Sequence, residues 1–157
     1  MDDIFYMREA LAEARAAAAC GEIPIGAVVV KDGEIIGRGH NTRKLDNAPL
    51  GHAELAALSQ AAERLNNWRF DGCSIYVTLE PCIMCSGALM QCRVSRVVFG
   101  AKDPKGGGCG SLYCIPKDSR IYHRPELSAG ILKEECAALL SDFFIKKRTE
   151  RASRNSE

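Results

Sequence analysis

The hydrophobic and polar positions of this chain follow two periods, one typical of helices and one typical of strands. Residues 4–18 carry an apolar side chain every three or four positions, which predicts a helix that an aspartate caps at its start and Gly21 ends. The same period predicts helices over residues 52–65 and from about residue 131, the latter with Phe143 on its apolar side. Each of these segments is expected to pack one face against a common layer.

Short apolar runs between these helices predict strands. Residues 26–30 and 34–37 flank the pair Asp32-Gly33, which favours a type I′ hairpin turn. The runs CSIYVTL and RVVFG hardly alternate, as expected for strands that are covered on both faces. Polar residues after Lys146 are expected to form a frayed tail. Strands that alternate with helices indicate an α/β layered domain.

The composition is that of an ordinary globular domain. The chain has 157 residues, of which 46% are hydrophobic and 26% charged, so one core without disulfide support is expected. A formal net charge of +1 restricts any nucleic-acid affinity to local patches. The charged N-terminal segment is unlike a secretory signal, and no apolar run is long enough to span a bilayer. A cytoplasmic protein with no membrane partner is therefore expected.

Two of the eight cysteines draw attention because they lie three residues apart in the run TLEPCIMC. Cys82 and Cys85 could bind a metal, form a disulfide, act as a redox couple or pack in the core. Clustered cysteines in a reducing compartment favour the metal. Pro81 suits the first turn of a helix that continues through Met90. The first turn of a helix would direct both sulfurs to one side and stabilise thiolates with its free N–H groups.

A third ligand would make this pair a catalytic zinc site. A structural site needs four protein ligands, and Cys109 and Cys114, five apart in a glycine-rich loop, do not supply a second close pair. A catalytic site uses three protein ligands and leaves one position to water. His52, at the irregular start of its helix, can be the third ligand, and Glu54 can then reach the bound water without ligating.

The run HAE followed by PCIMC resembles the signature of the zinc-dependent nucleobase deaminases. IPIGAVVV, the pair His40-Asn41, residues 76–112 and LLSDFF are similar to the bacterial tRNA adenosine deaminases, a resemblance that runs over nearly the whole chain. It implies a three-layer α/β/α cytidine deaminase-like fold with a central mixed five-stranded sheet. It also implies a single zinc-dependent deaminase domain over residues 1–150, a polar tail over residues 151–157, one Zn²⁺ per subunit and a homodimer.

The reaction that the resemblance implies is hydrolytic deamination of the wobble adenosine in the anticodon stem-loop of an arginine tRNA, with Glu54 as general base and then acid. Asn41 is expected to bind the base, with a plain turn asparagine as the alternative. The resemblance also implies that Ile25, Leu79 and Glu80 line the pocket and that Asp103 lies near the flanking nucleotide. Lys102 is a candidate for phosphate contact because of its charge, and Phe143 is a candidate for nucleotide contact, with core packing as its alternative. One departure is Ala48-Pro49-Leu50-Gly51, where this branch often has Asp-Pro-Thr-Ala, and it affects the packing of the loop around the nucleotide.

Two other functions stay open at this point. A deaminase of free guanine, cytosine or a nucleoside would share the zinc signature and differ only in its loops. A zinc-stabilised RNA-binding module would need a fourth protein ligand and would have no use for Glu54. Ordinary roles are expected for most other sulfur and imidazole groups: core packing for Cys20, Cys73, Cys92 and Cys136, loop thiols for Cys109 and Cys114, and a structural or solvent-facing place for His123.

Overall fold

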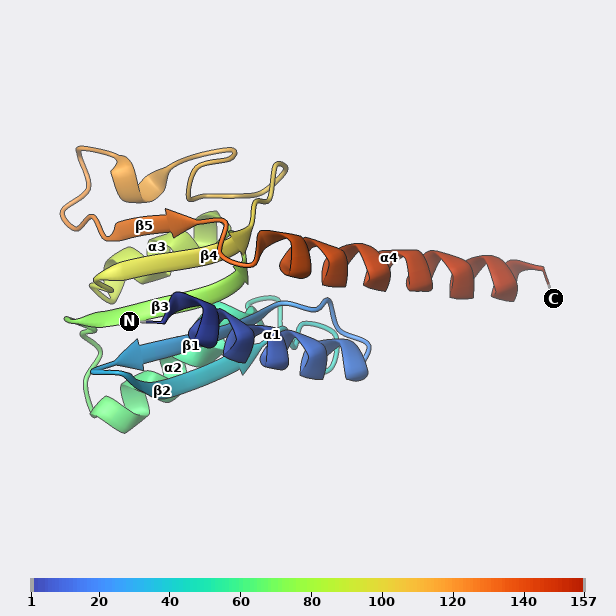
Figure 1. The fold of residues 1–157 in the computed structure, drawn as a ribbon, viewed down its shortest axis with the longest axis horizontal. Helices are drawn as coiled ribbons and strands as arrows, with labels where there is room; N and C mark the ends of the chain where they lie inside the picture. The colour runs from blue at the N-terminus through green and yellow to red at the C-terminus, as the bar shows by residue number, and fades with distance from the viewer. Residues whose placement is uncertain (1, 157) are drawn as a thin grey trace.

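The structure, a computed structural model, describes residues 2–156. Four α-helices, five strands and one short 3₁₀ helix follow one another in these residues, in an order that alternates strands with helices (Figure 1). In chain order they are α1 (Asp3–Ala19), β1 (Gly26–Lys31), β2 (Glu34–His40), α2 (Ala53–Leu65), β3 (Cys73–Leu79), α3 (Ile83–Gln91), β4 (Arg96–Ala101), η1 (Ile115–Lys117), β5 (Glu126–Ala129) and α4 (Lys133–Asn155).

The five strands form one mixed sheet in the order β2-β1-β3-β4-β5. β1 pairs antiparallel with β2 and with β3, whereas β3, β4 and β5 are parallel. The hairpin between β1 and β2 turns at Asp32 and Gly33, which have φ angles of 51° and 76°. Two successive positive φ angles are what a type I′ turn requires, so the hairpin prediction is confirmed.

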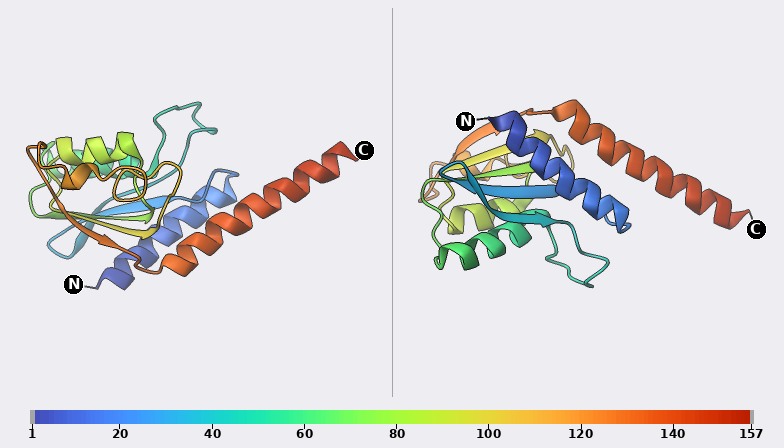
Figure 2. Two further views of the ribbon diagram at one scale, coloured as in Figure 1. Left: turned by 90° about the horizontal axis from the view of Figure 1, so that it is seen from above. Right: turned by 60° about the horizontal axis from the view of Figure 1, so that its bottom comes forward.

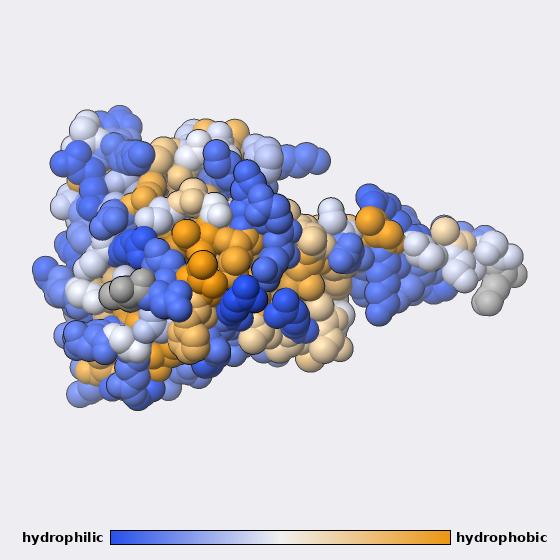
Figure 3. All heavy atoms as spheres, in the orientation of Figure 1, coloured by the Kyte–Doolittle hydropathy of each residue, from blue (hydrophilic) through white to orange (hydrophobic). Residues whose placement is uncertain are grey.

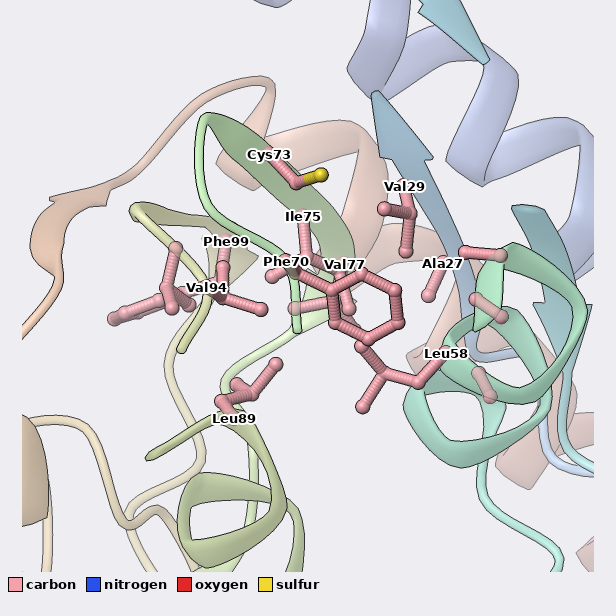
Figure 4. Close-up of a cluster of buried hydrophobic side chains, with 14 of the residues drawn as sticks. Ala27, Val29, Leu58, Phe70, Cys73, Ile75, Val77, Leu89, Val94 and Phe99 are labelled. Atoms are coloured by element: carbon pink, nitrogen blue, oxygen red, sulfur yellow. The ribbon is translucent and has the colours of Figure 1, made fainter. Parts of the chain in front are cut away.

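Helices cover both faces of the sheet, which gives the three layers that the resemblance implies (Figures 1 and 2). α1 and the first part of α4 lie on one face, over a buried cluster that includes Met7, Leu11 and Tyr76. α2 and α3 lie on the other, over a second cluster in which Phe70 and Ile75 are almost fully buried (Figure 4). The near-continuous apolar character of β1 and β3 follows from this double coverage.

Small residues bring α2 unusually close to the sheet. Gly37 and Gly39 of β2 have no room for a Cβ atom, because the backbone of Ala57 and Ala53 in α2 would lie against it. Ala53, Ala57 and Ala61 are fully buried on the facing side of the helix. This close approach fixes the start of α2 at the end of the sheet where β3 ends.

Two predictions from the pattern are wrong, and one strand was not predicted from it. Pro81 precedes α3, and Cys82 is its N-cap. The pattern predicted no strand over residues 126–129, where β5 lies, whereas the five-stranded sheet that the resemblance implies is confirmed. Residues after Lys146 continue α4 as far as Asn155 instead of fraying.

The end of α4 projects beyond the sheet, and its visible face is mostly hydrophilic (Figures 1 and 3). Cys136 is the buried residue of this helix, while Phe143 is half-buried and Phe144 is 44% exposed. A helix end with so little buried surface depends mainly on its own hydrogen bonds for its stability. Within residues 2–156, no helix has the length and apolar character that crossing a membrane demands.

Candidate active site

His52, Cys82 and Cys85 meet at the ends of two helices. His52 is the N-cap of α2 and Cys82 is the N-cap of α3, both in extended backbone conformations, and Cys85 lies in the first turn of α3. Nδ1 of His52 is 3.6 Å from Sγ of Cys82 and 3.4 Å from Sγ of Cys85. The three donor atoms lie within 4.8 Å of one another. The backbone N–H of Cys85 also donates to Sγ of Cys82, at 3.5 Å.

These distances fit one tetrahedral zinc ion. Zinc bonds of about 2.3 Å to sulfur and about 2.0 Å to nitrogen, at tetrahedral angles, separate the two donors by about 3.5 Å. The two N–S distances, 3.4 and 3.6 Å, match that separation. One imidazole and two thiols are also the donor types that zinc prefers. The cluster therefore fits zinc with three protein ligands.

The charges of the two sulfurs support a cation site. The hydrogen bond with Cys85 lowers the pKa of Cys82 to about 4, so Cys82 is a thiolate at neutral pH. The same hydrogen bond, followed by burial, raises the pKa of Cys85 well above its ordinary value. A second thiolate beside the first is thus opposed by repulsion and desolvation, and a divalent cation between the sulfurs removes both obstacles.

Glu54 lies beside this cluster and is only 4% exposed. It belongs to the first turn of α2, one residue beyond Ala53, and shares a small cavity with His52 and Cys82. Burial raises the pKa of its carboxyl group. A carboxyl group that holds its proton more readily than usual is suited to take up and release a proton near neutral pH.

The cavity above the cluster has a volume of about 120 Å³. It contains five of the seven residues predicted to bind substrate, together with neighbours from the same loops: Ile23, Ile25, Asn41, Arg43, His52, Ala53, Glu54, Leu79, Glu80, Cys82 and Asp103. Lys102 and Phe143 lie elsewhere. Lys102 lines a separate hollow beside β5, and Phe143 lines one between the end of α1 and α4.

A wider groove of about 530 Å³ adjoins the small cavity, and Ile23, Asn41 and Arg43 line both. Lys44 and the stretch Ala48–Pro49 also line the groove. The unusual tetrapeptide that ends in Gly51 therefore contributes to the groove wall and not to the metal cluster.

Glu80 lines the cavity, but its side chain mainly holds the glycine-rich loop. Its carboxylate accepts hydrogen bonds from the backbone N–H groups of Asp103 (3.1 Å), Cys109 (3.1 Å) and Ser111 (3.0 Å), and from the hydroxyl of Ser111. Burial alone would raise the pKa of Glu80, but these hydrogen bonds outweigh it and lower the pKa. Gly107 has no room for a Cβ atom because the Glu80 carboxylate occupies that place. Glu80 thus positions Asp103 at the cavity.

A third buried carboxylate, Glu22, is a residue that the sequence did not single out. It is 1% exposed, and its two oxygens accept hydrogen bonds from Nδ2 of Asn41 (3.2 Å) and from the backbone N–H of Leu45 (2.7 Å). The signal in the sequence was a charged residue between the helix-ending Gly21 and the apolar run of β1, where an unpaired charge is unexpected.

The other histidines and cysteines lie outside the cluster. Nε2 of His123 is 2.6 Å from the carbonyl oxygen of Val94, which supports its structural role. Nδ1 of His40 is 3.1 Å from a Glu13 carboxylate oxygen. All eight cysteines are free. Core packing is confirmed for Cys73 and Cys136, which are buried, and Cys92 is half-buried. The prediction of core packing is wrong for Cys20, which is exposed. The loop residue Cys109 is buried.

The chain is similar to known deaminases in both sequence and structure. It matches the MafB19-like deaminase family over residues 1–152. A tRNA-specific adenosine deaminase of Bacillus subtilis (strain 168) is 46% identical over 155 residues, 98% of this chain and 96% of that protein. One similar solved structure comes from biochemical and structural studies of A-to-I editing by tRNA:A34 deaminases at the wobble position of transfer RNA. It matches this chain with a TM-score of 0.84 and 40% sequence identity, and the match covers 87% of this chain and 99% of that one. A guanine deaminase from Bacillus subtilis has a TM-score of 0.62 and 36% identity, covering 65% of this chain and 66% of that one.

Proposed function

This chain belongs to the MafB19-like deaminase family, and we propose that it converts adenosine to inosine at the wobble position of a tRNA anticodon, as an arginine tRNA presents it. The relative that matches nearly the whole chain is a tRNA-specific adenosine deaminase. The observation that carries the chemistry is the convergence of His52, Cys82 and Cys85 beside the buried carboxyl group of Glu54.

The metal ligands in this proposal are His52, Cys82 and Cys85, which would hold one Zn²⁺ per subunit. When bound, Zn²⁺ acts as a Lewis acid that lowers the pKa of a water molecule towards about 7, so that a nucleophile forms at physiological pH. One imidazole and two thiolates offset the charge of the ion. The N-terminus of α3 favours the thiolate form of Cys82, and the cation would favour that of Cys85.

Glu54 is the proton carrier of the reaction. It accepts a proton from the attacking water and delivers it to the ring nitrogen next to C6 of adenine. It then accepts the remaining proton of the added oxygen and gives it to the amino group, and the C6–N bond breaks. The products are inosine and ammonia. Because Glu54 is excluded from bulk water, neither proton is easily exchanged with solvent during these steps.

The small cavity would hold the reacting base. Ile25 and Leu79 supply apolar walls, and Asn41 supplies an amide that can hydrogen-bond the edge of a purine. A cavity of about 120 Å³ cannot enclose a paired and stacked base, so a base within a nucleic acid must be turned outward to enter it. Anticodon loops present bases in that way.

The adjoining groove favours RNA over a free base as the substrate. A free base needs only the cavity, whereas the neighbouring nucleotides of an RNA strand need room and cations beside it. The groove of about 530 Å³ offers both, with Arg43 and Lys44 along it. Asp103 lies at the cavity and Lys102 is next to it in the chain, so the glycine-rich loop can contact a flanking nucleotide. Phe143 and the cations 146–148 on α4 can contact RNA farther from the reacting base.

A homodimer in the cytoplasm, where tRNA is available, completes the proposal. The resemblance to the tRNA adenosine deaminases suggests the dimer. Exposed apolar side chains, among them Leu112 and Tyr113 after the glycine-rich loop, supply surface that a second subunit can cover. Sedimentation velocity of the zinc-loaded chain tests this part separately from the reaction.

The experiment that tests the function compares RNA with free bases. Purified zinc-loaded protein is incubated with an anticodon stem-loop that has adenosine at the wobble position, and separately with free adenosine, guanine and cytosine, and inosine and ammonia are measured. We expect inosine from the stem-loop alone. A stem-loop with guanosine at the same position is the matched control. Ammonia from free guanine without inosine from the stem-loop would establish the guanine deaminase alternative, which the similarity to the Bacillus subtilis guanine deaminase makes the strongest rival.

A further inference from the structure

Glu22 is a buried charge that the reaction itself does not use. It follows Gly21, which ends α1 with a φ angle of +79°, and precedes β1. Its side chain is 1% exposed, so its carboxylate has left water almost completely. A buried carboxylate is costly unless hydrogen bonds replace its hydration. The N–H groups of Asn41 and Leu45 provide this replacement, one at each oxygen.

The bond to Asn41 determines how that amide is oriented. A carboxylate accepts hydrogen bonds and donates none, so the atom of Asn41 that faces Glu22 must be Nδ2 and not Oδ1. Asn41 is itself 3% exposed, and its backbone N–H donates to the carbonyl oxygen of Ile25 at 3.2 Å. Backbone and side chain are therefore both held, and the amide has one orientation.

The orientation matters because Asn41 lines the cavity together with His52 and Glu54. An asparagine amide has a donor end and an acceptor end, and a purine edge places acceptors and donors in a fixed order. If the amide turned over, the donor and the acceptor would exchange places and would no longer match the base. A site that depends on such a match loses much of its activity when the match is broken.

We propose that Glu22 is a positioning residue for base recognition, whose buried carboxylate fixes which end of the Asn41 amide faces the reacting base. This inference rests on the proposed function, because it takes the cavity to be the base site. Glu22 acts through Asn41: its hydrogen bonds are with Asn41 and Leu45, neither of which is a metal ligand. Its second bond, to Leu45, ties the loop after β2 to the same carboxylate, so the base site and the groove wall have a common anchor.

A double-mutant cycle tests this role. Glu22→Gln keeps the shape of the side chain, but it has one acceptor oxygen and one amino group, so it can accept only one of the two N–H groups and allows the Asn41 amide to turn over. We expect a loss in kcat/KM on the adenosine stem-loop of roughly tenfold or more, since the lost hydrogen bond is to a charged group. In an Asn41→Ala background the same change should cost less than about twofold, because the group that Glu22 orients is gone.

Glu80→Gln is the matched control. It also removes a buried carboxylate beside the cavity, but its partners are in the glycine-rich loop, so its loss should be equal in both backgrounds. Thermal unfolding and zinc content of each variant report on the fold. If Glu22→Gln unfolds, Glu22→Asp, which keeps the charge and shortens the reach to Asn41, enters the same cycle. Equal losses from Glu22→Gln with and without Asn41 would overturn the positioning role. An inactive wild-type chain would instead overturn the proposed function.

Discussion

Replacement of Glu54 by glutamine separates the chemistry of the site from its stability. The substitution keeps the size of the side chain and removes its ability to carry a proton. Glu54 is 4% exposed, so bulk water cannot replace it as proton carrier. General acid–base groups contribute about 10²- to 10⁴-fold to rate, which corresponds to about 3–5 kcal/mol of barrier. Because Glu54 serves both the attack and the departure of the amine, we expect a loss in kcat near the upper end of that range.

The stability of the fold should stay the same or rise in Glu54→Gln, although kcat falls. An ionised carboxylate that is buried costs free energy, and an amide of the same shape avoids most of that cost. Glu54→Gln should therefore unfold at the same temperature as the wild type or higher. Its zinc content should stay the same, because Glu54 is not among the three donors. The stability and activity of the variant would thus change independently.

The assay is single-turnover conversion of the adenosine stem-loop to inosine by zinc-loaded protein. Glu63→Gln, an exposed glutamate on the same helix, is the control and should keep wild-type kinetics. Retention of more than about a tenth of the wild-type kcat by Glu54→Gln, with full zinc content, would refute the role of Glu54 as proton carrier.

Three further predictions concern the metal, the glycine-rich loop and the pH dependence of stability. Cys85→Ser should lose zinc in metal analysis, whereas Cys136→Ser, equally buried but outside the cluster, should keep it while losing about 1–3 kcal/mol of stability; retained zinc in the first variant would contradict the ligand assignment. Gly107→Ala should lower kcat/KM about tenfold or more because its Cβ displaces the Glu80 carboxylate, whereas Gly87→Ala in α3, with open space around the added Cβ, should leave activity unchanged; equal effects would remove the loop from the account. The pKa of Asp3 is lowered chiefly by its hydrogen bond with Arg96, so this pair stabilises the fold above the ordinary aspartate pKa, and the stabilisation is lost as pH falls through the lowered pKa. Asp3→Asn should therefore cost about 1–3 kcal/mol in denaturant unfolding at pH 7 and progressively less in acid, and a cost that is independent of pH would contradict the ion pair.

Residues whose chemistry depends on local spacing could be predicted from the sequence. Cys82 and Cys85 are three residues apart at one helix start, so local geometry was enough to predict that their sulfurs lie on one side. His52, 30 residues before Cys82, was joined to them only by the need for a third ligand and by the resemblance. The positions of the strands along the chain could be predicted where each strand had its own apolar run. β5 has only four residues, two of them polar, and is a strand because β4 offers it a parallel edge. Such a strand depends on its partner, and no periodicity in its own residues could reveal it.

Residues whose role depends on a distant partner could not be predicted. Glu22 reaches Asn41 across a hairpin, and Glu80 reaches Ser111 across a helix and a strand. In both cases the side chain that orders the site is a buried carboxylate between apolar residues, a pattern that signals a partner without identifying it. Phe143 lines a hollow between the end of α1 and α4 and not the cavity, so its contact with substrate stays a prediction.

The central claim is that the cluster at the ends of α2 and α3 is a zinc centre with three protein ligands, which leaves a position for the reaction. X-ray absorption at the zinc edge of the purified, zinc-loaded chain tests it most directly. The account predicts two sulfur neighbours, from Cys82 and Cys85, one imidazole neighbour from His52 and one light atom from solvent. A third sulfur, as Cys109 could supply, or a second imidazole would show a closed structural site and contradict the account, as would a chain that binds no zinc at all.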